Sequence, residues 1–263
     1  MSPLPDKKQP GTGRSPLTAR VMVVGTPKAG KTTLASGWAP DTTLLLDTQR
    51  GTDLLPGEHY VQHVNDWPEF QAAVDELTTT DHPFKTVVID LIDDVWRFAD
   101  SHFAGKGAVL ASATDDWQRS IKTAEGMFTE TVGKLLASNM GVWFLGHARE
   151  KQDGQITRYQ AKLDARVLTY VQGASDFILL AEKLGPKHLL HTKPSAKFEA
   201  GTRVPLPEPL DLDARVLYAA MNKGLKDEAA KAAGKPAKKD EPVADAPAAE
   251  TEPADAEKEM TTA

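Results

Sequence analysis

Two glycines, a lysine and a threonine lie in this chain at a spacing that suits the phosphates of a nucleotide. The stretch from Gly25 to Thr32 reads GTPKAGKT and fits G-x-x-x-x-G-K-[ST] at every required position. Gly25 and Gly30 let the backbone curl so that successive N–H groups point at phosphate oxygens. Lys31 would neutralise the β- and γ-phosphates, and Thr32 would offer its hydroxyl to Mg²⁺. The spacing predicts a nucleoside triphosphate site.

The flanking sequence supplies the strand and the helix that such a loop needs. Residues 20–24 form a short apolar run, and residues 31–38 read as a helix start closed by Pro40. This context disfavours the alternative, a glycine-rich turn that binds nothing. Adenine is the default base because residues 192–195 lack the aspartate of a guanine-binding motif, so we expect ATP and Mg²⁺ as cofactors. The expected nucleotide contacts are Gly25, Thr26, Pro27, Lys28, Ala29, Gly30, Lys31, Thr32 and Thr33.

A second apolar run, residues 85–90, ends in a carboxylate as a Walker B strand does. We expect Asp90 to orient the water shell of Mg²⁺, so that Thr32 and Asp90 form the metal site. Lone apolar strands that end in aspartate are common. The Walker B assignment therefore depends on the position of this strand after the phosphate loop in the sequence. Asp93 and Asp94 are rivals only if the strand runs longer.

A further strand over residues 141–147 delivers His147 to the same edge of a parallel sheet. There a polar side chain could sense the γ-phosphate. The alternative is a histidine that merely caps the strand through a backbone hydrogen bond.

The remaining elements complete an α/β fold, a mostly parallel sheet flanked by helices with a C-terminal antiparallel hairpin. A strand is expected over residues 42–47, and Asp66 is a plausible N-cap for an amphipathic helix up to residue 80. Residues 95–113 start helical and loosen at 105–107. Further along we expect a long helix at 116–138, hairpin strands at 176–182 and 188–192, and a last short helix at 213–222.

Composition divides the 263 residues into one domain and two tails. We expect a flexible, mildly basic arm over residues 1–17, an ATPase domain over 18–222 and a disordered tail over 223–263. Residues 240–263 hold eight acidic residues against Lys258 alone. The acidic end is either a solubilising tail or an arm that competes for a basic groove or recruits a partner.

Several protein classes are disfavoured by composition. The chain has no cysteine, which removes disulfides and thiolate metal sites. No apolar run approaches the about 18 residues of a membrane span, and the proline-rich start lacks a signal-peptide core. We therefore expect no membrane partner and a cytoplasmic protein.

Two segments are basic enough to suggest a phosphate-rich partner. Residues 149–166, expected as a loop, have a net charge of +2, which is a weak signal by itself. Its basic residues are Arg149, Lys151, Arg158, Lys162 and Arg166, and Tyr159 lies among them. The second segment, residues 187–203, contributes Lys193, Lys197 and Arg203.

Taken together, the phosphate loop, residues 86–90, residues 142–147 and the 191–203 stretch resemble the RecA core. More narrowly, they are similar to the small phage RecA-like ATPases grouped with single-strand annealing proteins, which carry an AAA-type ATP-binding domain. The resemblance covers about residues 18–222, and only the phosphate loop is highly specific.

The resemblance implies single-stranded DNA as a partner and several copies of the chain in a ring or a filament. In such proteins the loops after the third and fourth strands line the DNA path, here residues 101–114 and 149–166. The resemblance thus makes the candidate DNA contacts Arg149, Lys151, Arg158, Tyr159, Lys162 and Arg166, with Tyr159 stacking on bases. It also makes Lys193, Lys197 and Arg203 candidates for phosphate contacts in an adjacent subunit. A single-strand binding protein is a further candidate partner.

One departure bears on catalysis. RecA-like relatives usually have Asp-x-Glu after the second strand, where this chain has Asp47, Thr48 and Gln49. Glutamine can hold an attacking water but cannot accept its proton, so hydrolysis is slow or Asp47 acts instead. Lys31, Asp90, Gln49 and His147 are thus the expected catalytic residues.

Three functions follow from these patterns. The first is a DNA-dependent ATPase that polymerises on single-stranded DNA for annealing or recombination. The second is a protein whose assembly or partner binding is gated by ATP with little hydrolysis, which Gln49 favours. The third is a P-loop phosphotransferase, which would want an arginine-rich lid and an enclosed pocket.

Overall fold

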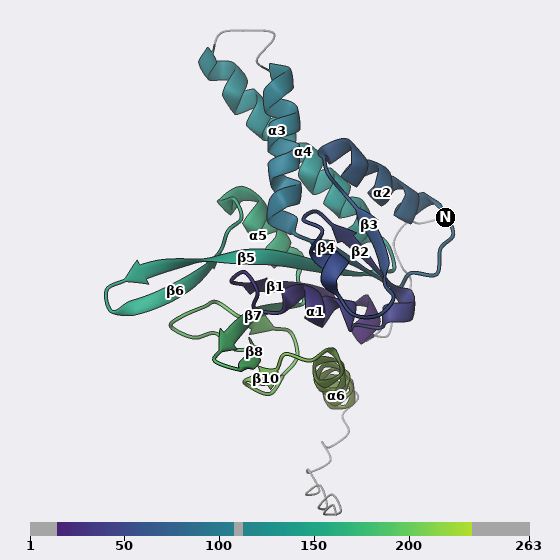
Figure 1. Ribbon diagram of the computed structural model, residues 1–263, viewed down its shortest axis with the longest axis vertical. Coiled ribbons are helices and arrows are strands. Elements are labelled where there is room, and N and C mark those ends of the chain that lie inside the picture. Colours follow the sequence, from purple (N-terminus) through teal and green to yellow (C-terminus); the bar gives the residue numbers. More distant parts are fainter. Residues whose placement is uncertain (1–14, 108–112, 233–263) are drawn as a thin grey trace, which may run out of the picture.

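The computed structural model describes residues 15–107 and 113–232. Its centre is one sheet with the strand order β10-β8-β7-β1-β5-β4-β2-β3, with β6 paired to β5 and β9 paired to β7 (Figure 1). The pairs β1–β5, β1–β7, β4–β5, β2–β4 and β2–β3 are parallel. The pair β7–β8 is antiparallel. The predicted fold class, a mostly parallel α/β sheet with a C-terminal hairpin, is confirmed.

The strands have these bounds: β1 Arg20–Gly25, β2 Thr43–Asp47, β3 Tyr60–His63, β4 Thr86–Asp90, β5 Gly141–Asp153, β6 Ile156–Ala161, β7 Phe177–Leu184, β8 Lys187–His191, β9 Gly201–Thr202 and β10 Leu210–Asp211. The α-helices are α1 Lys31–Ser36, α2 Trp67–Thr79, α3 Ile92–Gly107, α4 Ala113–Ala137, α5 Ala165–Ala174 and α6 Ala214–Ala232. Short 3-10 helices are η1 Pro16–Thr18, η2 Pro40–Thr42 and η3 Gly51–Leu54.

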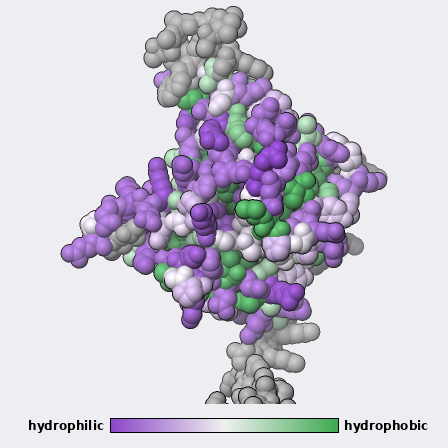
Figure 2. All heavy atoms as spheres, in the orientation of Figure 1, coloured by the Kyte–Doolittle hydropathy of each residue, from purple (hydrophilic) through white to green (hydrophobic). Residues whose placement is uncertain are grey.

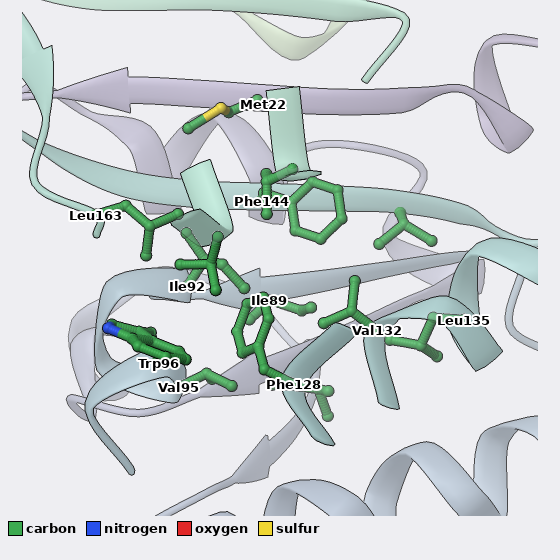
Figure 3. Packing of buried hydrophobic residues seen from close by; sticks show 14 of the residues in the cluster. Met22, Ile89, Ile92, Val95, Trp96, Phe128, Val132, Leu135, Phe144 and Leu163 are labelled. Atoms are coloured by element: carbon green, nitrogen blue, oxygen red, sulfur yellow. The ribbon is translucent and has the colours of Figure 1, made fainter. Parts of the chain in front are cut away.

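The sheet separates two hydrophobic cores. Alternate residues of β1 face opposite sides, so that Met22 belongs to one core and Val23 to the other. The first core contains side chains of α2, α3, α4 and α5, and Figure 3 shows Phe128 packed beside Ile89 within it. The second contains side chains of α1 and α6. Helices on both faces are what an all-parallel strand core requires.

The local sequence explains helix α2. Asp66 accepts a hydrogen bond from the backbone N–H of Glu69 at 2.9 Å, so it is the predicted N-cap of α2. The apolar residues Phe70, Val74 and Leu77 are buried on one face of that helix.

Three parts of the chain differ from the sequence expectations. Residues 149–166 are not a loop: β5 continues to Asp153 and pairs with β6, and α5 follows. The edge strand β3 was not predicted. The helix expected to end at residue 222 continues to residue 232, so residues 223–232 are helical rather than disordered.

The structure describes only a small part of the two predicted tails. Residues 1–14 of the expected arm and 233–263 of the expected tail fall outside the described residues, as do residues 108–112 of the first expected DNA loop. Pro16 of the arm is buried in η1, and the carbonyl of Leu17 accepts a hydrogen bond from Thr86 Oγ1 at 2.8 Å. Ordered structure therefore begins before residue 18.

Two hairpins project from the globular part (Figure 1): the helical pair α3–α4 and the two-stranded ribbon of β5 and β6. Hydrophilic residues dominate the surface of the ribbon (Figure 2). Among the helices that the structure describes, none combines the length and the apolar character needed to cross a bilayer.

Candidate functional site

The phosphate loop joins the carboxyl end of β1 to the first turn of α1. Gly25 lies so close to β7 that a Cβ there would stand 2.6 Å from the Ala181 carbonyl oxygen. Gly30, the residue before α1, has φ +101, a left-handed conformation that favours glycine. These two positions explain both required glycines of the motif. Pro27, Lys28 and Thr33 are exposed around the loop, whereas Ala29 is buried.

Lys31 is held at the mouth of this loop. Its ammonium donates hydrogen bonds to the carbonyl oxygens of Gly25 at 2.9 Å and Thr26 at 3.1 Å. Burial lowers the pKa of Lys31, while the nearby Asp90 and Asp93 carboxylates act in the opposite direction. The cation is therefore poised where the β- and γ-phosphates of a nucleotide in the loop would lie.

Thr32 and Asp90 meet as the sequence predicts. The Thr32 hydroxyl donates to Asp90 Oδ2 at 2.7 Å, across 58 residues of sequence. Burial raises the pKa of Asp90 to about 6, and Asp47 adds to the rise, whereas the hydrogen bond from Thr32 and the charges of Lys31 and His147 oppose it. A hydroxyl and a carboxylate beside a phosphate loop fit Mg²⁺, which takes few protein ligands there.

Asp47, at the end of β2, is a structural acceptor. Its carboxylate receives the backbone N–H groups of Gln49 at 2.9 Å, Gly51 at 3.3 Å and Thr52 at 2.9 Å. Burial alone would raise the pKa of Asp47, but these hydrogen bonds and the one from the Thr52 hydroxyl lower it. Since both oxygens shape residues 49–52, the expectation that Asp47 replaces the missing glutamate is not supported.

Gln49 lies at the same edge, because Asp47 pairs with Asp90 in the sheet. Its side-chain Nε2 donates to Asp94 Oδ2 at 2.6 Å. Asp94 also accepts from the Thr48 hydroxyl at 3.0 Å and pairs with Arg97 at 2.8 Å. Asp94, which the sequence offered only as a Walker B rival, is thus the anchor of the Gln49 side chain.

His147 stands directly beside the phosphate loop, because its Cα pairs with that of Gly25. Its Nδ1 lies 2.9 Å from Asp93 Oδ2, and its backbone N–H donates to Asp93 Oδ1 at 3.1 Å. Its own carbonyl accepts from the backbone N–H of Lys162 at 2.7 Å. The side chain is therefore more than a strand cap. The sequence missed the Asp93 contact, although the position of Asp93 just after Asp90 was a usable signal.

The four expected catalytic residues therefore gather at one edge of the sheet. They come from α1, β4, β5 and the loop after β2: Lys31, Asp90, His147 and Gln49.

The ribbon of β5 and β6 sorts the expected DNA contacts by face. Arg149 pairs with Gln160 and Lys151 pairs with Arg158, and directly opposed residues share a face. Arg149, Lys151 and Arg158 are thus on one face, all exposed; we call them the cationic face. Their row along β5 is the same alternate row that contains His147.

The other expected contacts are placed differently. Tyr159 is half-buried and pairs with Glu150 on the opposite face. Burial raises its pKa, and the carboxylates of Glu182 and Glu150 add to the rise. Arg166, at the start of α5, makes two contacts of 2.8 Å with Asp164. Lys162 is exposed where the ribbon returns to the sheet.

A cavity of about 320 Å³ lies between β6, α5 and residues 195–199. Arg149, Arg158 and Lys197 contribute positive charge to its wall, and Leu168 and Phe198 contribute apolar surface. The backbone N–H of β6 at residue 159 also donates to the Lys197 carbonyl at 2.7 Å. Lys197 therefore belongs to the ribbon region.

The three residues expected to reach an adjacent subunit are not brought together. Lys193 is exposed after β8, where its backbone N–H donates to Glu208. Arg203 pairs with Asp176 at 2.9 Å, at the amino end of β7 and thus at the sheet edge opposite the phosphate loop. Arg203 therefore lies at the sheet edge opposite this chain's own phosphate loop, and its expected contact with an adjacent subunit stays a prediction.

The chain was compared with protein-family models, with curated proteins and with solved structures. A family model described as "AAA domain" matches residues 17–204, which is most of the chain. A solved ATPase from the type III secretion system of pathogenic bacteria is similar, with 13% identity and a TM-score of 0.42 over 64% of this chain. The matched part spans 53% of that ATPase, about half its length. No curated protein matches.

Proposed function

The chain belongs to the AAA domain family, and we propose that it is a RecA-like ATPase whose nucleotide state is coupled to single-stranded DNA on the β5–β6 ribbon. The observation that carries this proposal is the continuity of β5. One strand contains His147 beside the phosphate loop and, in the same alternate row, Arg149 and Lys151 of the cationic face.

The nucleotide part rests on three side chains. Lys31 supplies a cation from within the loop, and the contact of Thr32 with Asp90 provides the hydroxyl and the carboxylate beside it. Mg²⁺, when bound, would neutralise charge on the phosphates. The two protein groups would hold it on the β4 side of the loop, where His147 also lies.

The DNA part is supported by charge and exposure. Three exposed cations on one face of a two-stranded ribbon offer a row of phosphate contacts. Because these side chains are exposed, the folded protein does not have to bury their charge. The adjoining cavity adds Lys197 and apolar surface on which an unstacked base can rest. Tyr159 also lines this cavity, so it remains the candidate for stacking on a base.

The proposal extends to assembly. Several copies would form a ring or a filament on the DNA for annealing or recombination, with Lys193, Lys197 and Arg203 as the candidate contacts to the nucleotide of a neighbouring subunit. A single-strand binding protein would be met by the acidic residues 240–263, which lie beyond the described part of the chain.

The test measures ATP turnover with and without single-stranded DNA at several salt concentrations. The variant Arg149→Gln/Lys151→Gln/Arg158→Gln should lose DNA stimulation but keep nucleotide binding. A matched control, Lys122→Gln/Arg215→Gln/Lys226→Gln, removes the same charge from exposed positions on α4 and α6. DNA binding that survives the ribbon variant at low salt, or falls equally in the control, would contradict the ribbon assignment.

A second function has one specific observation in its favour. Gln49 replaces the usual glutamate, and its amide is tethered to Asp94. Such a protein would bind ATP to gate assembly or partner binding with little hydrolysis. DNA binding that requires ATP, with turnover no faster than in Lys31→Ala, would select this function over the first.

A further inference from the structure

If the chain hydrolyses ATP, some group has to accept a proton from the attacking water, and the usual glutamate is absent. The carboxylates at the nucleotide edge are committed elsewhere. Asp47 holds the backbone of residues 49–52, and Asp94 holds Thr48, Gln49 and Arg97. Asp90 accepts the Thr32 hydroxyl at the expected metal position.

The fourth carboxylate, Asp93, is bound on both oxygens by His147. Oδ1 accepts the backbone N–H of His147 and Oδ2 lies 2.9 Å from Nδ1. A carboxylate only accepts, so Nδ1 carries the hydrogen and the neutral ring presents Nε2 as an acceptor. The double contact fixes both the backbone and the ring of His147. The imidazole thus arrives beside the phosphate loop in a defined tautomer.

The other candidate proton acceptors near the loop either lie away from the β4–β5 side of it or already contact another group. His63 ends β3, separated from β1 by β2, β4 and β5. His188 lies on the β8 side, where its Nδ1 is 2.9 Å from the Ala29 carbonyl oxygen. Glu182 of β7 is 2.9 Å from His191 Nε2. Asp90 is on β4, next to β5, so the γ-phosphate side is the His147 side.

We propose that His147 is the catalytic base of ATP hydrolysis and that Asp93 is its positioning residue. This inference rests on the proposed ATPase function. A water oxygen bonds to the γ-phosphorus as the bond to the β–γ bridging oxygen breaks, and ADP leaves with that electron pair. One water proton passes to His147 Nε2, and the other stays on the phosphate product. The imidazolium then releases its proton to solvent.

The charges that surround this ring come from three elements: Asp93 on α3, Asp90 on β4 and Lys31 on α1. The pH profile of turnover therefore reports on the whole group, and the variants below separate the contribution of the ring.

The experiment compares His147→Gln and Asp93→Asn with wild type and with the control His63→Gln. His147→Gln should lower kcat by about 10²–10⁴-fold, the usual contribution of a general base. Binding of a fluorescent ATP analogue should change less than about threefold, which also shows that the variant is folded. The acidic limb of the kcat–pH profile should vanish in His147→Gln and remain in His63→Gln.

Asp93→Asn needs a readout that a merely structural role would not move. Ring ¹⁵N shifts of His147, measured without nucleotide, should report the Nδ1–H tautomer in wild type and a mixture in Asp93→Asn. A wild-type ring with Nε2–H overturns the proposal, because it has no acceptor to offer.

The kinetic outcomes distinguish a failure of the His147 assignment from a failure of the proposed ATPase function. Turnover that is lost in Lys31→Ala but kept within threefold in His147→Gln leaves the ATPase standing and removes His147 as the base. Wild-type turnover no faster than that of Lys31→Ala overturns both together.

Discussion

The nucleotide edge and the β5–β6 ribbon are both polar, yet they are built in opposite ways. At the edge, Lys31, Asp47, Asp90 and Asp94 are each less than 10% exposed and hydrogen-bonded. On the ribbon, the cationic face of Arg149, Lys151 and Arg158 is exposed. Buried polar groups are costly to leave unpaired, whereas exposed charges act through a screened field.

The difference shows how one strand can serve two purposes. Residues Val142 to Leu145 of β5 are fully buried in the two cores, and the strand leaves the globular part after His147. Changes at the edge should therefore be severe and coupled. Changes on the ribbon should be mild, nearly additive and dependent on salt.

The largest contrast is expected between two lysines. Lys31→Ala should lower kcat by about 10²–10³-fold, because it removes a preorganised cation from a buried site. Lys151→Ala should leave turnover without DNA unchanged. Steady-state ATPase assays of both variants decide this, and an equal loss in the two would abolish the distinction between the regions.

The next effect concerns stability and pH. Burial raises the pKa of Asp90 in the folded protein to about 6. This group should therefore stabilise the fold increasingly as the pH falls from 7 toward the pKa that Asp90 has in the unfolded chain. The difference of about 2 pKa units corresponds to at most about 3 kcal/mol. Denaturant unfolding at pH 7 and pH 5 without Mg²⁺ measures the part of this gain that lies above pH 5, about 1 kcal/mol.

Asp90→Asn should remove that dependence, whereas Lys151→Gln should keep it. Asp47, whose folded-state pKa is lowered, acts in the opposite sense only when the pH falls below the unfolded value. The two carboxylates thus affect separate pH windows, and a pH dependence unchanged in Asp90→Asn would contradict the assignment.

A smaller effect should appear on the ribbon. Each of the three cations that contacts a DNA phosphate contributes about 0.7 to the slope of log affinity against log salt. Replacing all three by glutamine should therefore reduce the slope by about 2. Fluorescence anisotropy with labelled single-stranded DNA over a salt series gives this value, and three equal single-variant steps would show additivity.

The smallest effect is expected at Arg166. Its guanidinium already contacts both oxygens of Asp164 on an exposed surface, where such pairs contribute about 0–1 kcal/mol. Arg166→Gln should change DNA affinity less than about threefold in the same assay. A loss as large as that of the ribbon variant would extend the DNA surface to α5.

Much of the edge could be predicted because its signals are local. The loop from Gly25 to Thr32 is contiguous, and parallel strands that end in Asp90 and His147 meet at one edge. The partners of Gln49 and His147 could not be read in the same way. Asp94 and Asp93 reach them from the first turn of α3, and this depends on the register of helix and sheet.

The ribbon and the end of α6 were mispredicted for a different reason. Both faces of the ribbon are polar, so residues 149–160 lack the apolar alternation by which half-buried strands are recognised. In residues 223–232 the helix continues mainly through alanine, lysine and glutamate, which favour helix, while Gly224 and Leu225 supply its contact with the second core. Periodicity detects burial, and these segments have little to bury.

The projection of the ribbon from the sheet (Figure 1) also bears on how this fold can diversify. Residues beyond Ala148 on β5 belong to neither hydrophobic core. Their length and charge can therefore drift under selection while the folding of the domain is left intact. A lineage could acquire a new ligand at the tip of β5 and keep the same nucleotide machinery at its base.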